Sequence, residues 1–378
     1  MARRLPFLLL SLIAVVIAVA TVVEHHHGSH VAYDWVYGAV WFKLLWGAVT
    51  ASAIVLLFRK KLWRQWRVLW LHMAFVVILM GALVTSLTSR RGVISLREGE
   101  TAMHYMVPDG NSANVMQLKP MPFYLSLDSF RVLYDEDGVT PANYVSYVQI
   151  WDQREREAAA ISMNNIGRAH GYRIFQTSYD EDLHGTLLTV SYDPWGTGIT
   201  YAGYLLLAIG MVCMSRTRRA AQDVTKRPAR KYQWGLWVLA VLLSSYMVVA
   251  IAFRPLVPVL RSPMLIIHVG TIMISYVLLI VSILKRSLLK VAVFFLMAGI
   301  FLGAMWANIS WGSYWSWDPK EAWALVTLIV YSIPLHQESL PWFRSDKHYR
   351  LYCLLCLLCL LMTYFGVNYL LGGMHSYA

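Results

Sequence analysis

The chain has 378 residues, of which 58% are hydrophobic and only 14% are charged, and its formal net charge is +12. This composition excludes an ordinary soluble domain. The positive charge suggests a nucleic-acid partner at first. Most Lys and Arg residues lie between apolar segments, however, which indicates membrane topology and argues against nucleic acid.

Nine apolar segments approach the roughly 20 residues that an α-helix needs to cross a bilayer. The first follows Met-Ala-Arg-Arg, as in a signal peptide, but its long apolar run favours a retained anchor. We therefore predict an α-helical polytopic membrane protein with about nine transmembrane helices. The spans lie near residues 5–23, 40–58, 68–88, 199–215, 233–252, 263–284, 290–308, 319–336 and 351–371.

The distribution of positive residues predicts the orientation of the chain. If the N-terminus is cytoplasmic, 20 of the 33 Lys and Arg residues fall in cytoplasmic segments, and the short outer loops hold few. The positive-inside rule then predicts a multi-pass protein of the cell inner (cytoplasmic) membrane. Its C-terminus and residues 89–198 are expected to be extracytoplasmic.

Residues 89–198 are enough for one small domain. Partial alternation and many aromatic or β-branched residues predict strands there, and Asp137-Gly138 predicts a turn. We therefore expect one small mostly-β extracytoplasmic domain. Its predicted strands are residues 123–134, 144–151, 172–179 and 186–193.

The chain thus divides into four predicted parts. Residues 1–88 form a three-span membrane region, and residues 89–198 form the outer domain. Residues 199–232 contain the fourth span and a basic cytoplasmic linker, and residues 233–378 form a five-span region.

Three of the four cysteines form the segment CLLCLLC in the last span, and Cys213 stands alone in the fourth. The C-x-x-C spacings of Cys353, Cys356 and Cys359 suggest a redox or metal site. Leucine fills every gap, however, and apolar surroundings make a thiol unreactive. We interpret these cysteines as packing residues.

The segment WGSYWSWDPKEAW, residues 311–323, concentrates aromatic side chains between two apolar runs. Asp318, Pro319 and Glu321 predict a helix start, with an N-cap, a proline at the first position and a capping box. An interfacial aromatic belt usually scatters one or two Trp per helix end. The higher density here favours a binding surface for a large, flat, apolar ligand. Its rings are those of Trp311, Tyr314, Trp315 and Trp317.

A flat ligand with a central metal needs axial ligands, and four of the twelve histidines are placed to supply them. His72 and His336 lie at the predicted cytoplasmic ends of the third and eighth spans, whereas His268 and His375 lie near outer ends. Ionisable residues inside a membrane are costly and indicate function. Because imidazole is a normal iron ligand, two pairs at two depths fit bis-histidine haem ligation.

The two predicted sites lie on opposite sides of the membrane. From Pro319 to His336 the helix is about 26 Å long, close to the hydrocarbon thickness of a bilayer. A further segment, EHHHGSH, is expected to be a solvated outer loop. It contains His25, His26, His27 and His30.

These residues carry a resemblance to a known family. WGSYWSWDPKEAW resembles the tryptophan-rich WWD signature of cytochrome c maturation proteins, and GVNYLLGGMHSYA at the end is similar to the CcsA half of the system II cytochrome c synthases. YRIFQTSYDEDLHGTLLTVSYDPWG, residues 172–196, is similar to the CcsB half. The chain resembles the fused CcsB–CcsA (ResB–ResC) type, with a much shorter outer domain.

The resemblance implies that the protein binds haem b, moves it to the outer face and attaches it to the C-x-x-C-H segment of apocytochrome c. It also implies extracytoplasmic thiol-reducing partners, and haem iron ligation by His72, His336, His268 and His375. A haem transporter without lyase activity and a b-type cytochrome electron carrier are the alternatives. The implied haem-binding residues are Trp311, Gly312, Tyr314, Trp315, Trp317, Asp318, Lys320 and Glu321.

Overall fold

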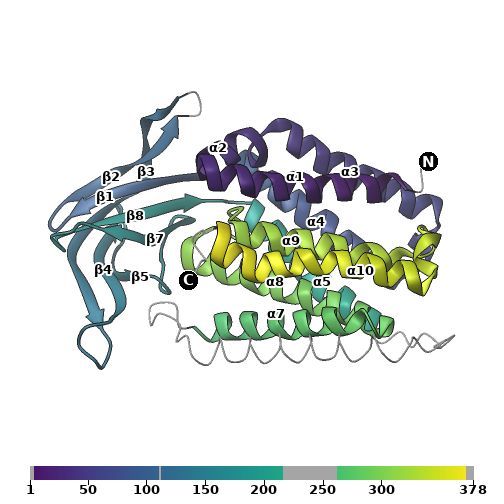
Figure 1. Cartoon of the computed structure of the whole chain (residues 1–378). Helices are drawn as coiled ribbons and strands as arrows, with labels where there is room; N and C mark the ends of the chain where they lie inside the picture. The colour runs from purple at the N-terminus through teal and green to yellow at the C-terminus, as the bar shows by residue number, and fades with distance from the viewer. Residues whose placement is uncertain (1–3, 110–111, 216–261, 372–378) are drawn as a thin grey trace.

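The computed structural model describes residues 4–109, 112–215 and 262–371, and it combines a bundle of helices with a β-sheet domain beyond one end of the bundle (Figure 1). Seven described helical segments are long and apolar enough to cross a membrane. They are Leu5–His27, Val40–Arg59, Trp66–Thr88, Gly196–Met214, Pro263–Ser282, Arg286–Trp311 and Asp346–Leu371.

The regular helices within the described residues follow the apolar runs of the sequence. Short 3-10 turns at Leu62–Arg64, Arg286–Leu288 and Pro341–Arg344 connect some of them. The last helix continues in π-helical form over Met362–Leu371. The α-helices are α1 Leu5–His27, α2 Ser29–Ala32, α3 Val40–Arg59, α4 Trp66–Thr88, α5 Gly196–Ser215, α7 Pro263–Ser282, α8 Leu289–Trp311, α9 Pro319–Ser332 and α10 Asp346–Leu361.

Two of the nine predicted spans do not appear among the seven. Residues 233–252 lie outside the described residues. The predicted span 319–336 forms α9, which has 14 residues, followed by a 3-10 turn at Ile333–His336. Because a 3-10 turn rises more per residue than an α-helix, the two together are about 29 Å long, close to a bilayer core. The number of spans therefore remains a prediction.

The expected first outer loop is helical, although its histidines His25, His26, His27 and His30 are exposed as predicted. α1 continues to His27 instead of ending near residue 23, and α2 and a π-helical turn at Tyr33–Tyr37 follow directly. The Gly28 N–H donates to the Glu24 carbonyl at 2.8 Å, and the Ser29 hydroxyl donates to the Glu24 carboxylate at 2.9 Å. These hydrogen bonds satisfy polar groups at the C-terminal end of α1. Residues 28–37 then form a compact helical segment, which we call the helical cap.

The outer domain is a single antiparallel sheet with the order β5-β4-β3-β2-β1-β8-β7-β6. Side chains from both edges, such as Ile161 of β5 and Ala169 of β6, share one core, so the sheet is rolled. The strands are β1 Arg90–Arg97, β2 Thr101–Asp109, β3 Ser112–Tyr134, β4 Pro141–Trp151, β5 Arg156–Ser162, β6 Gly167–Ala169, β7 Tyr172–Tyr179 and β8 Gly185–Tyr192.

The four predicted strands correspond to β3, β4, β7 and β8, and the predicted turn is present, with the Gly138 N–H donating to Asp135 O at 2.9 Å. Sequence reasoning missed the other four strands. β5 reads REAAAIS, and alanine and glutamate favour helices over strands. Its pairing with β4 over seven residue pairs decides its conformation.

The sheet is attached to the bundle through α4 and α5. α4 leads directly into β1 and β8 leads into α5, and β1 and β8 are paired along their full length from Arg90 to Arg97. The two helices approach very closely, because a Cβ atom at Gly81 would overlap Thr200. The sheet is therefore joined directly to two tightly packed helices, α4 and α5, and these helices fix its position at one end of the bundle.

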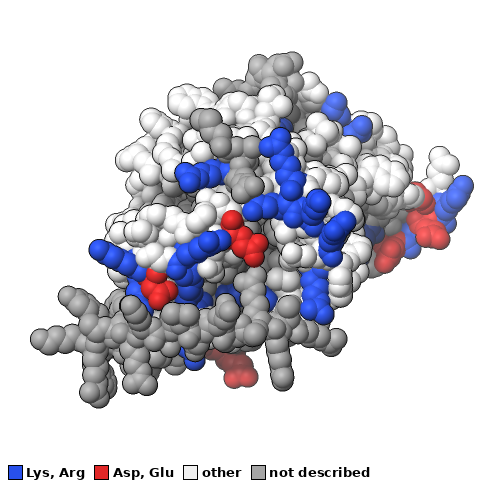
Figure 2. Space-filling model, turned by 90° about the vertical axis from the view of Figure 1, so that its right-hand side faces the viewer, with Lys and Arg blue, Asp and Glu red and all other residues white. Residues whose placement is uncertain are grey.

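The opposite end of the bundle is rich in positive side chains. Figure 2 shows this end, where Lys and Arg gather around the helix connections with few acidic residues between them. The connections between α3 and α4 and between α9 and α10 supply Lys60, Lys61, Arg64 and Arg344, and the first turn of α10 supplies Lys347.

Candidate haem sites

The tryptophan-rich loop joins α8 to α9 at the end of the bundle that faces the sheet. α8 ends at Trp311, and Gly312 follows with φ of 73°, a left-handed conformation that favours glycine. A Cβ atom at Gly312 would overlap the ring of Phe175 from β7. The loop therefore needs glycine here both for its backbone turn and for its contact with the outer domain.

The predicted start of α9 is confirmed at Asp318 and Pro319, and the capping box stays a prediction. The Asp318 carboxylate accepts from the Lys320 N–H at 2.9 Å, and Pro319 is the first helical residue. The Glu321 carboxylate accepts from the Ser316 N–H at 2.8 Å. Trp317 has φ of 61°, and this reversal of the chain brings Ser316 to the carboxylate.

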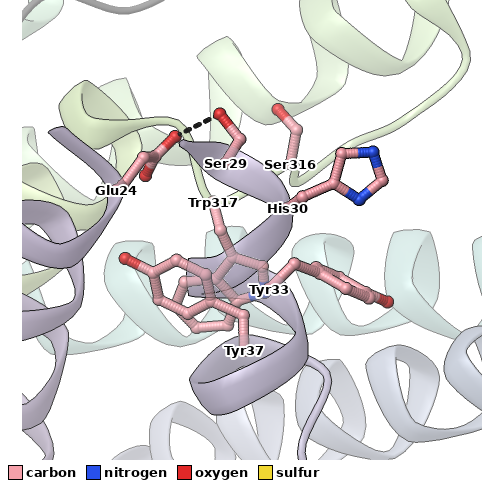
Figure 3. Close-up of a pocket in the computed structure, with 7 residues that line it drawn as sticks. All are labelled: Glu24, Ser29, His30, Tyr33, Tyr37, Ser316 and Trp317. Carbon is pink, nitrogen blue, oxygen red and sulfur yellow. Dashed lines mark hydrogen bonds between the residues drawn. The ribbon is translucent and has the colours of Figure 1, made fainter. Parts of the chain in front are cut away.

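The aromatic rings of the loop pack on several partners and do not form one flat shelf. Trp315 and Trp317 meet nearly at right angles, with ring centroids 5.8 Å apart. Trp317 stacks on Tyr37 at 4.6 Å with an interplanar angle of 8°, and it meets Phe42 edge-on at 5.5 Å. One face of Trp317 is therefore covered by Tyr37, which lies between α1 and α3 in the sequence (Figure 3).

Hydrogen bonds tie the loop and α9 to the rest of the bundle. The Tyr314 hydroxyl donates to Thr85 at 2.8 Å, and the Thr85 hydroxyl donates to Asp193 at 2.9 Å. Burial raises the pKa of Tyr314, so its hydroxyl remains a donor at neutral pH. At the start of α9, Lys320 donates to the Asn368 side chain at 2.9 Å. These contacts hold the loop and the start of α9 between α4 and the π-helical segment Met362–Leu371.

Two arginines of the sheet lie beside the loop, and the sequence analysis assigned a role to neither of them. Arg91 donates to the Trp311 carbonyl at 3.3 Å, and Arg173 donates to the Asn308 side chain at 2.8 Å. Loss of hydration and the charge of Arg173 both lower the pKa of Arg91, and burial lowers the pKa of Arg173. The carboxylate of Asp193 raises the pKa of Arg173 in part, and a further anion would stabilise the two neighbouring cations. The segment YRIFQTSYD contains Arg173, but nothing in its pattern distinguishes this arginine from a surface residue.

The structure brings His72 and His336 together at the end of the bundle away from the sheet. Their ring centroids are 6.0 Å apart and nearly perpendicular. Each Nδ1 lies beside a carbonyl of its own helix, Val68 at 2.8 Å and Ser332 at 3.0 Å, which orients the ring and leaves Nε2 for a metal.

The spacing of the two rings suits a shared metal ion. Imidazoles on opposite sides of one ion have nitrogens about 4 Å apart and ring centres about 6 Å apart, because metal–nitrogen bonds are about 2 Å. Phe7 of α1 lies against His336, with ring centroids 5.2 Å apart, and covers the pair on one side. His72 lies on α4, which precedes the sheet domain in the sequence, and His336 lies in the 3-10 turn that follows α9.

The predicted outer pair is only partly described. His375 lies outside the described residues. His268 is on α7, and its Nδ1 lies 2.7 Å from the Gly299 carbonyl, while its ring packs against Gly303 of α8. Gly303 is eight residues before Trp311, which is about 12 Å along the helix. The described contacts therefore place His268 below the loop, within the helical bundle.

Comparisons with known proteins match two separate regions of the chain. The family described as ResB-like matches residues 47–190, and the family described as Cytochrome C assembly protein matches residues 283–375. Protein NrfI of Wolinella succinogenes is 47% identical, over 22% of this chain and 9% of that protein.

Two CcsA proteins are also similar. Cytochrome c biogenesis protein CcsA of Chlamydomonas reinhardtii is 37% identical over 32% of this chain and 43% of that protein. CcsA of Oenothera argillicola is 43% identical over 25% of this chain and 29% of that protein. The chain thus covers less than half the length of each of these relatives.

A ResB-like region and a cytochrome c assembly region therefore occur in one multi-pass membrane chain, together with the aromatic loop and the histidine pair. In this combination the chain is similar to the fused ResB–CcsA type of the system II cytochrome c synthases.

Proposed function

We propose that this protein acts in cytochrome c biogenesis as a holocytochrome c synthase. It binds haem b at the cytoplasmic side, passes it to the outer face, and attaches it to apocytochrome c. The observation that carries the proposal is the pairing of His72 with His336, at the far end of α9 from the tryptophan-rich loop. One helix thus connects two candidate haem sites at two depths.

The inner site would take haem through its iron. The Nε2 atoms of His72 and His336 are the candidate axial ligands, and each ring is held by a carbonyl of its own helix. Because one ligand comes from each family region, haem binding here would also hold the two regions together.

The outer site would hold haem through its flat face, its carboxylates and its iron. Trp311, Trp315 and Trp317 offer aromatic surface, and Arg91 and Arg173 are the candidate partners of the two haem propionates. His268 and His375 remain the proposed axial ligands of this site. Gly312, Tyr314, Asp318, Lys320 and Glu321 would act by fixing the loop.

The proposed reaction adds each thiol of a C-x-x-C-H segment across a haem vinyl group. Sulfur bonds to one vinyl carbon and hydrogen to the other, so no atom is lost and no oxidant is consumed. The protein would contribute orientation, by holding the vinyl edge beside a thiol, and would exclude water. Both thiols must be reduced beforehand, which is the task proposed for extracytoplasmic thiol-reducing partners.

Co-expression with an apocytochrome c in a strain that lacks its own maturation system tests the activity. We expect covalent haem on the partner, detected as haem stain that survives denaturing electrophoresis. A control apocytochrome with both cysteines of its C-x-x-C-H segment replaced by alanine should remain unstained. Haem bound to this protein without covalent product would instead select a haem transporter or a b-type electron carrier.

We also propose the orientation in which the N-terminus is cytoplasmic and residues 89–198 are extracytoplasmic. The clustered Lys and Arg at the end of the bundle away from the sheet support it (Figure 2). A reporter enzyme that is active only outside the cytoplasm should be active when fused after Ala378. The same reporter fused after Arg64 should be inactive. The reverse pattern would exchange the two proposed haem sites and contradict the direction of transport.

A further inference from the structure

One row of paired residues crosses five strands of the sheet on a single face. Side chains that lie directly opposite each other in neighbouring antiparallel strands share a face. The row begins on β7 and ends on β3, and its members are Phe175, Thr189, Val93, Met106 and Leu118. Arg173 and Arg91 lie two residues from Phe175 and Val93, and both pair with Ser191, so they belong to the same face.

The β7 end of this face lies against the helical bundle. Phe175 is only 1% exposed, and its ring is so close to Gly312 that a Cβ atom there would overlap it. Arg91 donates to the Trp311 carbonyl of the same loop. The face that carries the row is therefore turned toward the bundle, and so toward the bilayer surface around the bundle.

The β3 end of the row lies beyond the bundle. The exposed fraction rises along the row from 1% at Phe175 to 68% at Leu118. Leu118 belongs to a hairpin of residues 101–109 and 112–120, which we call the β2–β3 arm. Figure 1 shows the arm standing out from the sheet on the side of α1 and α2 and reaching back toward the bundle.

The apolar side chains of the arm are on the face away from the domain core. Lys119 pairs with Tyr105, whose ring belongs to that core, so Lys119 and Gln117 are on the core side of the arm. Met116 and Leu118 alternate with them on the other face, and they are 53% and 68% exposed. A sheet face in water is normally polar, and a two-stranded hairpin alone is marginally stable, so this apolar face favours a covering partner.

We propose that the apolar face of the β2–β3 arm rests on the lipid bilayer, in the leaflet nearest to the sheet. This face is turned toward the bilayer surface and extends past the bundle. Neither Lys, Arg, Asp nor Glu is found among its described side chains, which fits the boundary between headgroups and acyl chains. Exposed Tyr33 and Trp35 of the helical cap lie at the same end of the bundle, as in an interfacial aromatic belt.

Photo-crosslinking of the full chain tests the proposal. p-Benzoylphenylalanine is incorporated in place of Leu118, the protein is irradiated in phosphatidylcholine nanodiscs, and lipid adducts are counted by mass spectrometry. The same group in place of Val139 is the reference. Val139 is 77% exposed and lies in the turn between β3 and β4, which Figure 1 shows away from the bundle. We expect about tenfold more lipid adduct at Leu118 than at Val139, because only the former would reach the acyl boundary.

A pair of charge variants tests the face of the arm. With the crosslinker at Leu118, Met116→Asp should lower the lipid adduct about fivefold, because a charge is costly on a face that contacts lipid. Gln117→Asp adds the same charge one residue away on the other face, and it should leave the adduct unchanged. An equal loss in both variants would mean that the charge acts on the arm as a whole, and it would overturn the assignment.

The remaining outcomes identify other partners. Lipid adducts at Leu118 that do not exceed those at Val139 would overturn the proposal. In membranes that also contain an apocytochrome c, adducts of Leu118 with that polypeptide, or with a second copy of this chain, in place of lipid would assign the face to a protein partner. The assay in nanodiscs needs neither haem nor cytochrome, so its result is independent of the proposed synthase activity.

Discussion

Replacing His336 or His72 by glycine is expected to remove most of the haem that copurifies with this protein. Each ring would contribute one of two iron ligands, and their centroids are only 6.0 Å apart. Bis-histidine ligation needs both rings, so either single variant should have a large effect. Haem per protein, measured by the absorbance of the reduced pyridine complex, is the readout, and the amount of protein in the membrane should change little.

A histidine outside the pair provides the control for this prediction. His348 lies near the same end of the bundle, stacked on Trp342 with ring centroids 4.6 Å apart, and His348→Gly should retain haem. Added imidazole should restore part of the haem spectrum in His336→Gly, because it can occupy the space that the side chain leaves. Normal haem content in both His72→Gly and His336→Gly would mean that these rings only pack.

Substituting Gly312 by alanine is expected to lower covalent haem transfer to apocytochrome c by tenfold or more, with haem retained at the inner pair. Gly312 has φ of 73°, which costs about 1–2 kcal/mol for a residue with a Cβ atom, and that atom would also overlap Phe175. The loop would have to move away from the sheet and from Arg91. Covalent product in the co-expression assay and haem content of the purified protein are measured together.

Gly47→Ala is the control for the loop variant, since a Cβ atom at Gly47 meets no atom within 4 Å. A second variant separates the two causes. Adding Phe175→Leu to Gly312→Ala should recover part of the transfer, because a smaller side chain relieves the overlap while the backbone penalty remains. Wild-type transfer by Gly312→Ala would show that the position of this loop against the sheet has no role in the reaction.

Some features of this protein follow from short stretches of sequence. Hydrophobicity over about 20 residues is a local property, so seven of the predicted spans coincide with long apolar helices. The start of α9 at Asp318 and Pro319 was predictable for a similar reason, because the cap and the proline act within one helical turn. Alternating patterns likewise predicted four of the strands.

Other features depend on residues that are distant in the sequence. The strand conformation of β5 comes from pairing with β4, against its own preference. Glu321 also accepts from the Ser316 N–H, which the reversal of the chain at Trp317 brings to it and which the sequence pattern did not predict. The first contact outweighs a local preference, and the second depends on a loop conformation.

The candidate sites show the same division. The sequence by itself identified the aromatic loop by its density of Trp and Tyr, and the membrane histidines because ionisable residues are costly in a bilayer. Only the tertiary structure placed His72 against His336, Arg91 and Arg173 beside the loop, and Tyr37 against Trp317. Each of these sets joins residues that precede α5 to residues of α8 or later segments. The residues of each set are close because of helix and sheet packing, which no local pattern encodes.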